Sequence, residues 1–164
     1  MGAASATSYL PTTMEIRDLL GGLLGREVTL TPAPPLLPSA SDPRSVAVFV
    51  DDSQAVRAVI VCDLGFSAYA GAALALLPVP VAQEAIEAKA LDETLTETLY
   101  EVLNVAAALF NVGEAAHVRL LELHPAGPAL PAAVTGRMLT LGRREDLEVT
   151  VTGYGTGRMS VVLC

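Results

Sequence analysis

The stretch that decides the fold reads TETLYEVLNVAAALFN and covers residues 96–111. On a helix, at about 100° per residue, its apolar side chains and the preceding Leu95 fall on one side. That stripe consists of Leu95, Leu99, Val102, Leu103, Ala106, Leu109 and Phe110. Asp92, just ahead of it, is a suitable N-cap. We therefore predict a long helix that begins after Leu91 and packs one face against a core.

The opposite side of this helix is mainly polar. It carries Glu97, Glu101, Asn104, Ala108 and Asn111, spaced by four, three, four and three residues. A polar stripe is ordinary for a surface helix, and Glu-x-x-Asn is a weak pattern by itself. Asn is a poor helix former, however, and is better placed near a cap. Small neighbouring side chains would let the surface of another protein approach the polar tips.

The elements around this helix occur twice in the same order. The second half continues with a strand at 116–123, a Pro-rich loop, a strand at 137–141, a turn, and strands at 147–154 and 157–164. The first half has a helix in 12–25, a strand at 27–31, a Pro-rich loop, and a hairpin of strands at 46–50 and 55–62. A short Ala-rich helix at 66–77 closes the first half, and a helical turn within 81–90 opens the second.

This repeated order predicts duplication of one unit. Short turns between strands favour an antiparallel sheet, so the expected fold is α+β, with pseudo-twofold symmetry and two long helices packed on one face of the sheet. We expect residues 12–164 to form a single domain, with pseudo-repeats at about 12–77 and 81–164, after a flexible N-terminus of residues 1–11. In the first helix, Thr12 and Glu15 form a capping box, and Gly25 follows its end.

Composition excludes several classes of function. The chain has 164 residues, of which 52% are hydrophobic and 17% charged, and this is typical of a globular domain. Its formal net charge of −8 argues against nucleic-acid binding. No segment resembles a membrane span or a signal peptide. Cys62 and Cys164 lie in apolar runs without metal-ligand spacing, which predicts reduced core thiols in a cytoplasmic protein.

Other candidate constellations are better explained as structural. His117 and His124, the two histidines, lack a Ser-His-Asp arrangement or a cysteine partner. The segment GYGTGR at 153–158 lies between two strands and opens no helix, so we predict a hairpin turn and not a phosphate loop. Asp51 and Asp52 are likewise interpreted as a turn. No metal site is predicted.

The helix at 96–111 resembles the signature helix of the CheC/CheX/FliY family of phosphatases, which act on the phosphorylated chemotaxis response regulator CheY. The family pattern is an acidic or Ser residue, three spacers, Glu, two spacers and Asn, followed by a Pro about two dozen residues later. Here Glu97, Glu101 and Asn104 match it, and Pro125 and Pro128 bracket the expected proline. The resemblance covers nearly the whole chain, because the family fold is also a pseudo-twofold arrangement.

The resemblance also implies how many sites there are and which residues form them. The first helix has Glu15 and Asp18 where two-site members repeat the Glu and Asn, so a single site on the second helix looks like the CheX arrangement, which implies a homodimer. Asn104 would orient the water that attacks an aspartyl phosphate, much as Gln does in GTPases. Glu101 would anchor the complex, by pairing with the partner's Lys.

The remaining implications concern the partner. The phosphorylated CheY-like response regulator would supply Mg²⁺, so this chain would need no cofactor of its own. Three residues on the same stripe, Glu97, Ala108 and Asn111, would contact that partner. The main alternative is a non-catalytic module that binds a response regulator or a flagellar-switch protein. A purely structural dimerisation domain is the third hypothesis.

Overall fold

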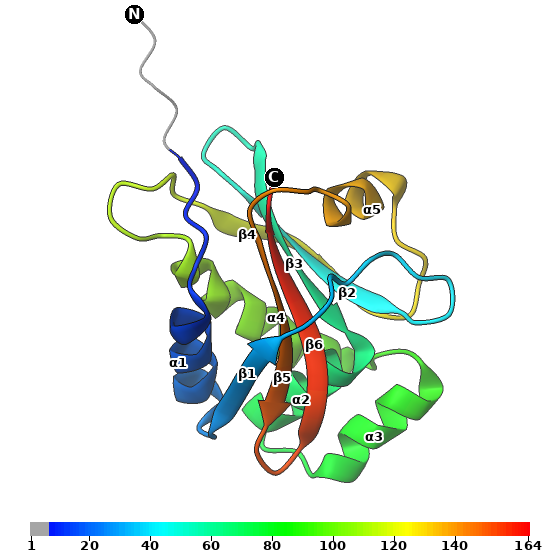
Figure 1. Ribbon diagram of the computed structural model, residues 1–164. Coiled ribbons are helices and arrows are strands. Elements are labelled where there is room, and N and C mark those ends of the chain that lie inside the picture. Colours follow the sequence, from blue (N-terminus) through cyan, green and yellow to red (C-terminus); the bar gives the residue numbers. More distant parts are fainter. Residues whose placement is uncertain (1–6) are drawn as a thin grey trace, which may run out of the picture.

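The structure is a computed structural model that describes residues 7–164 (Figure 1). The helices are α1 (Thr13–Leu24), α2 (Leu64–Leu74), α3 (Val79–Ala88), α4 (Glu93–Ala106) and α5 (Ala132–Met138), with a 3₁₀ turn, η1 (Ala107–Leu109). The strands are β1 (Val28–Pro32), β2 (Arg44–Val50), β3 (Val56–Asp63), β4 (Arg119–His124), β5 (Arg144–Val151) and β6 (Gly155–Leu163). Together they form the predicted α+β fold.

The order of the strands shows the pseudo-twofold symmetry directly. The six-stranded sheet runs β1-β5-β6-β3-β2-β4, and every neighbouring pair is antiparallel. Exchanging β1 with β4, β2 with β5, and β3 with β6 gives the same order read backwards. The two hairpins therefore meet at the sheet centre through β3 and β6, and β1 and β4 form its edges (Figure 1). Under this exchange α1 corresponds to α4.

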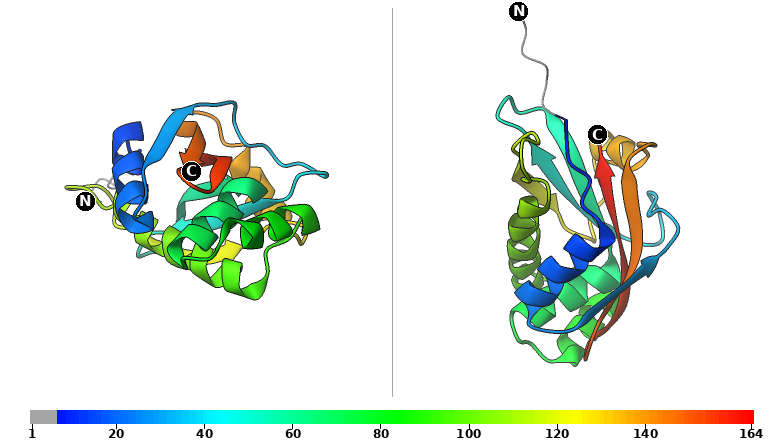
Figure 2. Two further views of the ribbon diagram at one scale, coloured as in Figure 1. Left: turned by 90° about the horizontal axis from the view of Figure 1, so that it is seen from below. Right: turned by 60° about the vertical axis from the view of Figure 1, so that its left-hand side comes forward.

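The two long helices cover one face of the sheet, as predicted, and α2 lies with them (Figure 2). Ile16 and Leu20 of α1 and Leu99 and Leu103 of α4 are fully or almost fully buried in the same cluster as sheet residues such as Phe49. The Phe49 ring lies 5.2 Å from that of Phe110, which follows η1. Burial of apolar area on this face is the main stabilising contribution expected for the domain.

The other face of the sheet is also covered, which the sequence pattern did not predict. Loop 33–43 and α5 lie over it (Figure 2). A second core cluster joins Leu36 of the loop and Val134 and Met138 of α5 to sheet residues including Val46 and Val61. Strands β2 and β3 are thus buried on both faces, which explains their nearly unbroken apolar sequences.

The helix termini follow the predicted capping. Thr12 Oγ1 accepts from Glu15 N–H, and Glu15 Oε1 accepts from Thr12 N–H at 2.9 Å, so the capping box is present. Gly25 ends α1 at φ 65, in the left-handed region where glycine is favoured. Asp92 caps α4 by accepting from Leu95 N–H at 2.8 Å. The predicted helical turn at 81–90 is the complete helix α3.

The predicted strand at 137–141 was wrong. Residues 132–138 form α5, which begins after Pro131 and presents Val134 and Met138, four residues apart, to the sheet. The predicted turn at 142–146 was also misplaced, because β5 already begins at Arg144. The hairpin of the second repeat is β5–β6, which turns at Gly153 with φ 86, as predicted for the segment GYGTGR.

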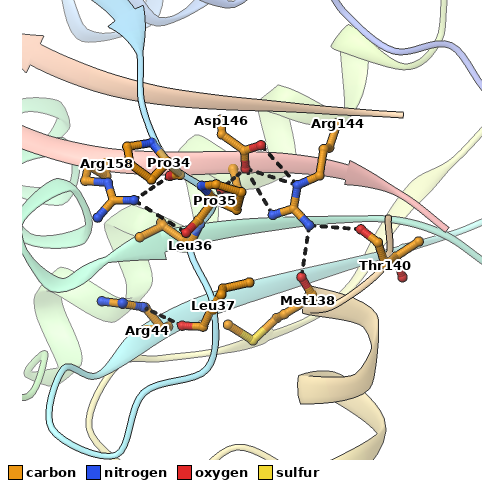
Figure 3. A network of polar contacts seen from close by, with 11 residues as sticks. Pro34, Pro35, Leu36, Leu37, Arg44, Met138, Thr140, Arg144, Asp146 and Arg158 are labelled. Carbon is orange, nitrogen blue, oxygen red and sulfur yellow. Dashed lines mark hydrogen bonds and ion pairs between the residues drawn. The ribbon is translucent and has the colours of Figure 1, made fainter. Parts of the chain in front are cut away.

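A network of polar contacts ties loop 33–43 and α5 to the sheet (Figure 3). Ser160 Oγ accepts from Leu36 N–H at 3.1 Å and donates to Asp146 Oδ1 at 2.5 Å. Asp146 forms an ion pair with Arg144 at 3.0 Å, and the two side chains are only 12% and 9% exposed. Arg144 also donates to the carbonyl of Met138 at 3.1 Å, at the C-terminal end of α5. Loop 33–43 and the C-terminal end of α5 are therefore held to the sheet by one connected set of side chains.

The N-terminus predicted to be flexible divides into two parts. Residues 1–6 lie outside the described residues. In the rest, Ala116 N–H donates to Thr7 O at 3.2 Å, Arg143 donates to Ser8 O at 2.9 Å, and Leu10 packs on the main core. Among residues 7–164, no helix is long and apolar enough to cross a membrane.

Candidate functional site

One side of helix α4 is buried and the other is exposed, as the sequence predicts. Every residue of the predicted core stripe is buried, from Leu95 to Phe110. Glu97, Glu101 and Asn104 all lie on the exposed side. Glu101 and Asn104 are one turn apart, a spacing that puts their Cβ atoms about 5–6 Å from each other.

The polar groups of this row are available to a partner. Within residues 7–164, the side chains of Glu97, Glu101 and Asn104 take part in no hydrogen bond or ion pair. The surrounding sequence is acidic throughout, because residues 90–118 contain Asp92, Glu93, Glu97, Glu101 and Glu114 but no Lys or Arg. A cationic group on a partner would meet no positive charge from this segment.

Apolar side chains accompany the polar row. Thr96, Glu97, Tyr100 and Glu101 line a depression of about 390 Å³. Tyr100 is 41% exposed, and Val105, beside Asn104, is 44% exposed. Exposed aromatic and aliphatic groups next to unpaired polar groups are typical of protein-docking surfaces. The sequence analysis did not single out Tyr100, although it lies next to Glu101.

Two predicted contact residues lie beyond the regular helix. Helix α4 ends at Ala106, and Ala108 is an exposed residue of η1. Asn111 follows η1, and its carboxamide accepts from Val118 N–H at 2.8 Å and donates to Val118 O at 3.0 Å. This side chain therefore fastens the segment that leads into β4, and its role in partner contact stays a prediction.

The corresponding helix of the first repeat does not present a free pair. Glu15 accepts hydrogen bonds from Thr12 N–H and from Tyr9 OH, at 2.9 Å and 2.6 Å, and these bonds hold the pKa of its carboxyl below the usual value. Asp18 forms an exposed ion pair with Arg17 at 3.2 Å. Carboxylates cannot donate a hydrogen bond as Asn does. The two pseudo-equivalent helices therefore differ in chemistry.

The prolines that follow the motif lie directly after β4. Ala126, next to Pro125, accepts from Leu91 N–H at 3.2 Å, just ahead of the N-cap of α4. Ala126 N–H also donates to Ser45 Oγ at 3.0 Å. This segment thus fixes the start of α4 on the sheet. Pro128 is exposed.

The other candidate residues have ordinary surroundings. His124 lies 3.1 Å from Glu122, and His117 is exposed. Asp51 closes the β2–β3 turn by accepting from Ser53 N–H at 2.9 Å. Cys62 is fully buried, while Cys164 is only partly so, and burial raises the pKa of both thiols. Among residues 7–164, no three His, Cys, Asp or Glu side chains are grouped as metal ligands would be.

Comparison with known proteins identifies proteins that share the fold, but it does not show the function. No protein-family profile matches the sequence, and the comparison with curated proteins found no match. The FliM–SpeE complex from H. pylori matches with a TM-score of 0.57 at 11% identity, over 90% of this chain and 79% of that one.

Two further structures are similar. The FliM middle domain from H. pylori matches with a TM-score of 0.54 at 11% identity, over 92% of this chain and 83% of that one. FliY from Thermotoga maritima matches with a TM-score of 0.50 at 13% identity, over 90% and 82%. At such identities the similarity shows a shared fold and not a shared function. It includes both FliM and FliY, so it does not select the CheX arrangement.

Proposed function

We propose that this protein accelerates hydrolysis of the aspartyl phosphate of a CheY-like response regulator, using the outward face of α4. The observation that carries the proposal is the exposed, unpaired row of Glu97, Glu101 and Asn104 on a helix whose other side is buried. A rigid helix is a precise platform for groups that must be positioned against a partner. The shared fold with FliY supports the proposal.

The proposed chemistry needs little from this chain. Hydrolysis of an aspartyl phosphate proceeds by in-line attack of water, and catalysis of phosphoryl transfer depends on positioning and on electrostatic stabilisation. The carboxamide oxygen of Asn104 would accept a hydrogen bond from the attacking water, and its NH₂ group would donate one to a phosphoryl oxygen. The carboxylate of Glu101 would pair with the regulator's Lys. The regulator would supply Mg²⁺.

The proposal assigns one active face to each protomer. On α1, Glu15 is held by its capping box and Asp18 by Arg17, so neither reproduces the free Glu and Asn of α4. A cytoplasmic homodimer belongs to the same proposal. Its natural contact surfaces would be the sheet edges β1 and β4, of which β4 exposes Leu121 at 42%.

The second candidate is a docking module without catalysis. The similarity to FliM favours it, since the FliM middle domain has this fold and FliM from H. pylori forms a complex with SpeE. The exposed Tyr100 and Val105 would serve such a module equally well.

One experiment separates the two candidates. In this experiment, CheY-like receiver domains of the source genome are first phosphorylated in vitro. Phosphate release from them, and their binding to this protein, are then measured with the wild type, Asn104→Ala and Gln83→Ala. Gln83, an exposed amide on α3, is the matched control. Acceleration that is lost only in Asn104→Ala, with binding kept, supports the phosphatase. Binding without acceleration by the wild type supports the docking module. If the wild type showed neither binding nor acceleration, both candidate functions would be overturned.

A further inference from the structure

The only lysine of the chain lines a pocket together with two arginines. Arg44, Lys89 and Arg158 border a pocket of about 350 Å³, together with Asp42 and Asp63. The remaining lining residues are Pro43, Leu64, Gly65 and Ile86. The three cations come from β2, from the residue after α3, and from β6, so the fold brings them together from distant parts of the sequence. None of the lining residues belongs to α4, so this pocket is separate from the face proposed above.

The positive charges in this pocket are not paired. Within residues 7–164, none of the three cations lies within 4.0 Å of a carboxylate oxygen. Instead they donate to backbone carbonyls of loop 33–43. Arg44 Nε lies 3.2 Å from Leu37 O, and Lys89 Nζ lies 3.4 Å from Ser41 O. Arg158 donates to two prolyl carbonyls of the same loop (Figure 3). Carbonyls orient these side chains without neutralising them.

One donor in the pocket lacks a partner. The Nε of Arg158 is buried and has no acceptor within residues 7–164, so an anion in the pocket could satisfy it. Lys89 is the C-cap of α3 and has φ 55, in the left-handed region that commonly ends a helix and favours glycine.

The donors of the pocket suit an anion that accepts several hydrogen bonds. Three cations and two carboxylates line it, so positive charge is in excess there, in a chain whose net charge is −8. Asp63 Oδ1 already accepts from Phe66 N–H at 2.7 Å, as the N-cap of α2. A phosphoryl group accepts bidentate hydrogen bonds from guanidinium groups, and the pocket offers two of these, from Arg44 and Arg158.

We propose that Arg44, Lys89 and Arg158 form a binding site for the phosphoryl group of a small molecule. The pocket volume is at the lower end of the range for ligand sites, so the molecule is inorganic phosphate or a compact phosphate ester. Leu64 and Ile86 give the pocket an apolar wall for the organic part of an ester.

The test is an NMR titration of the ¹⁵N-labelled protein with inorganic phosphate and with AMP. Acetate at matched ionic strength is the control anion. The expected result is saturable shifts of the amides of Gly65, Lys89 and Arg158, with none of these saturating in acetate. Equal affinities would identify inorganic phosphate as sufficient, and tighter binding of AMP would identify an ester. Shifts that grow linearly with every anion, or that map elsewhere, would overturn the proposal.

The decisive variant is Lys89→Gly, because glycine suits the backbone conformation at this position. Its melting temperature is expected to equal or exceed that of the wild type, so any loss of binding cannot come from unfolding. Affinity for phosphate should fall about tenfold or more, as expected for removal of a charged hydrogen-bond donor. Arg158→Gln should have a similar effect. Arg17→Gln, which removes an exposed arginine from α1, should have none. Wild-type affinity in Lys89→Gly would refute the site.

Discussion

Helices α2 and α4 are in close contact at Gly71, and a methyl group added at this position should push the two helices apart and destabilise the domain. Gly71 lies in α2, and a Cβ built on it would be 2.9 Å from Thr98 Oγ1 and 3.0 Å from the carbonyl oxygen of Leu95, both in α4. Both distances are shorter than a normal van der Waals contact. The Leu95 carbonyl belongs to the helix backbone, so it cannot move aside as a flexible side chain would.

The size of the effect follows from two opposing contributions. Overpacking a buried contact costs about 1–3 kcal/mol, and replacing Gly by Ala within a helix gains about 0.5–1 kcal/mol. Gly71→Ala should therefore lower the free energy of unfolding by about 0–2.5 kcal/mol, which corresponds to about 0–10 °C in melting temperature for a domain of this size.

The matched control is the same substitution at an exposed helical position that touches no other element. Gly22 is an exposed residue of α1, and a Cβ built on it meets nothing within 4 Å. Gly22→Ala should therefore raise stability by about 0.5–1 kcal/mol. Urea denaturation of both variants gives the comparison. Thr98→Ala in the Gly71→Ala background should recover part of the loss. If Gly71→Ala were as stable as Gly22→Ala, the close approach of α2 and α4 would be refuted.

Three other substitutions test the caps and the polar network. Asp92→Ala removes the acceptor for Leu95 N–H and should cost about 1 kcal/mol in thermal denaturation, with no loss contradicting its role as N-cap. For Glu15, a backbone hydrogen bond and then a tyrosine hydroxyl lower the pKa, so the stability it contributes is present above the usual carboxyl pKa and lost as pH falls through the lowered value. The stability deficit of Glu15→Gln should accordingly be larger at about pH 7 than at about pH 3, and a deficit independent of pH would contradict this. Ser160→Ala leaves the buried N–H of Leu36 without its acceptor and removes one of the donors to Asp146, so it should cost about 1–3 kcal/mol by urea denaturation, whereas wild-type stability would refute the network.

The sequence predicts a helix most reliably where apolar residues recur at helical spacing after a capping residue. The stripe from Leu95 to Phe110 is buried as expected, since helical spacing alone determines which side chains share a face. The pseudo-twofold arrangement was also correct, because the strand order is unchanged when β1, β2 and β3 are exchanged with β4, β5 and β6 and the order is read backwards.

The failures have physical causes as well. The apolar run at 137–141 was interpreted as a strand, but Pro131 starts a helix just before it and Met138 is buried at helical spacing from Val134. The cover over the second face was missed because loop 33–43 packs through Leu36 alone, which gives no periodic signal. The Lys89 pocket was missed because its charges come from three distant segments, which only the folded chain brings together.

The role proposed for Asn104 is to position the attacking water. This role is tested most directly by the rate constant of receiver dephosphorylation at saturating protein, measured for the wild type and for Asn104→Ala under single-turnover conditions. We predict that the wild type accelerates hydrolysis and that Asn104→Ala loses about 10²-fold or more of that acceleration, the scale found for removal of one oriented catalytic group. Equal rate constants for the two proteins would contradict it.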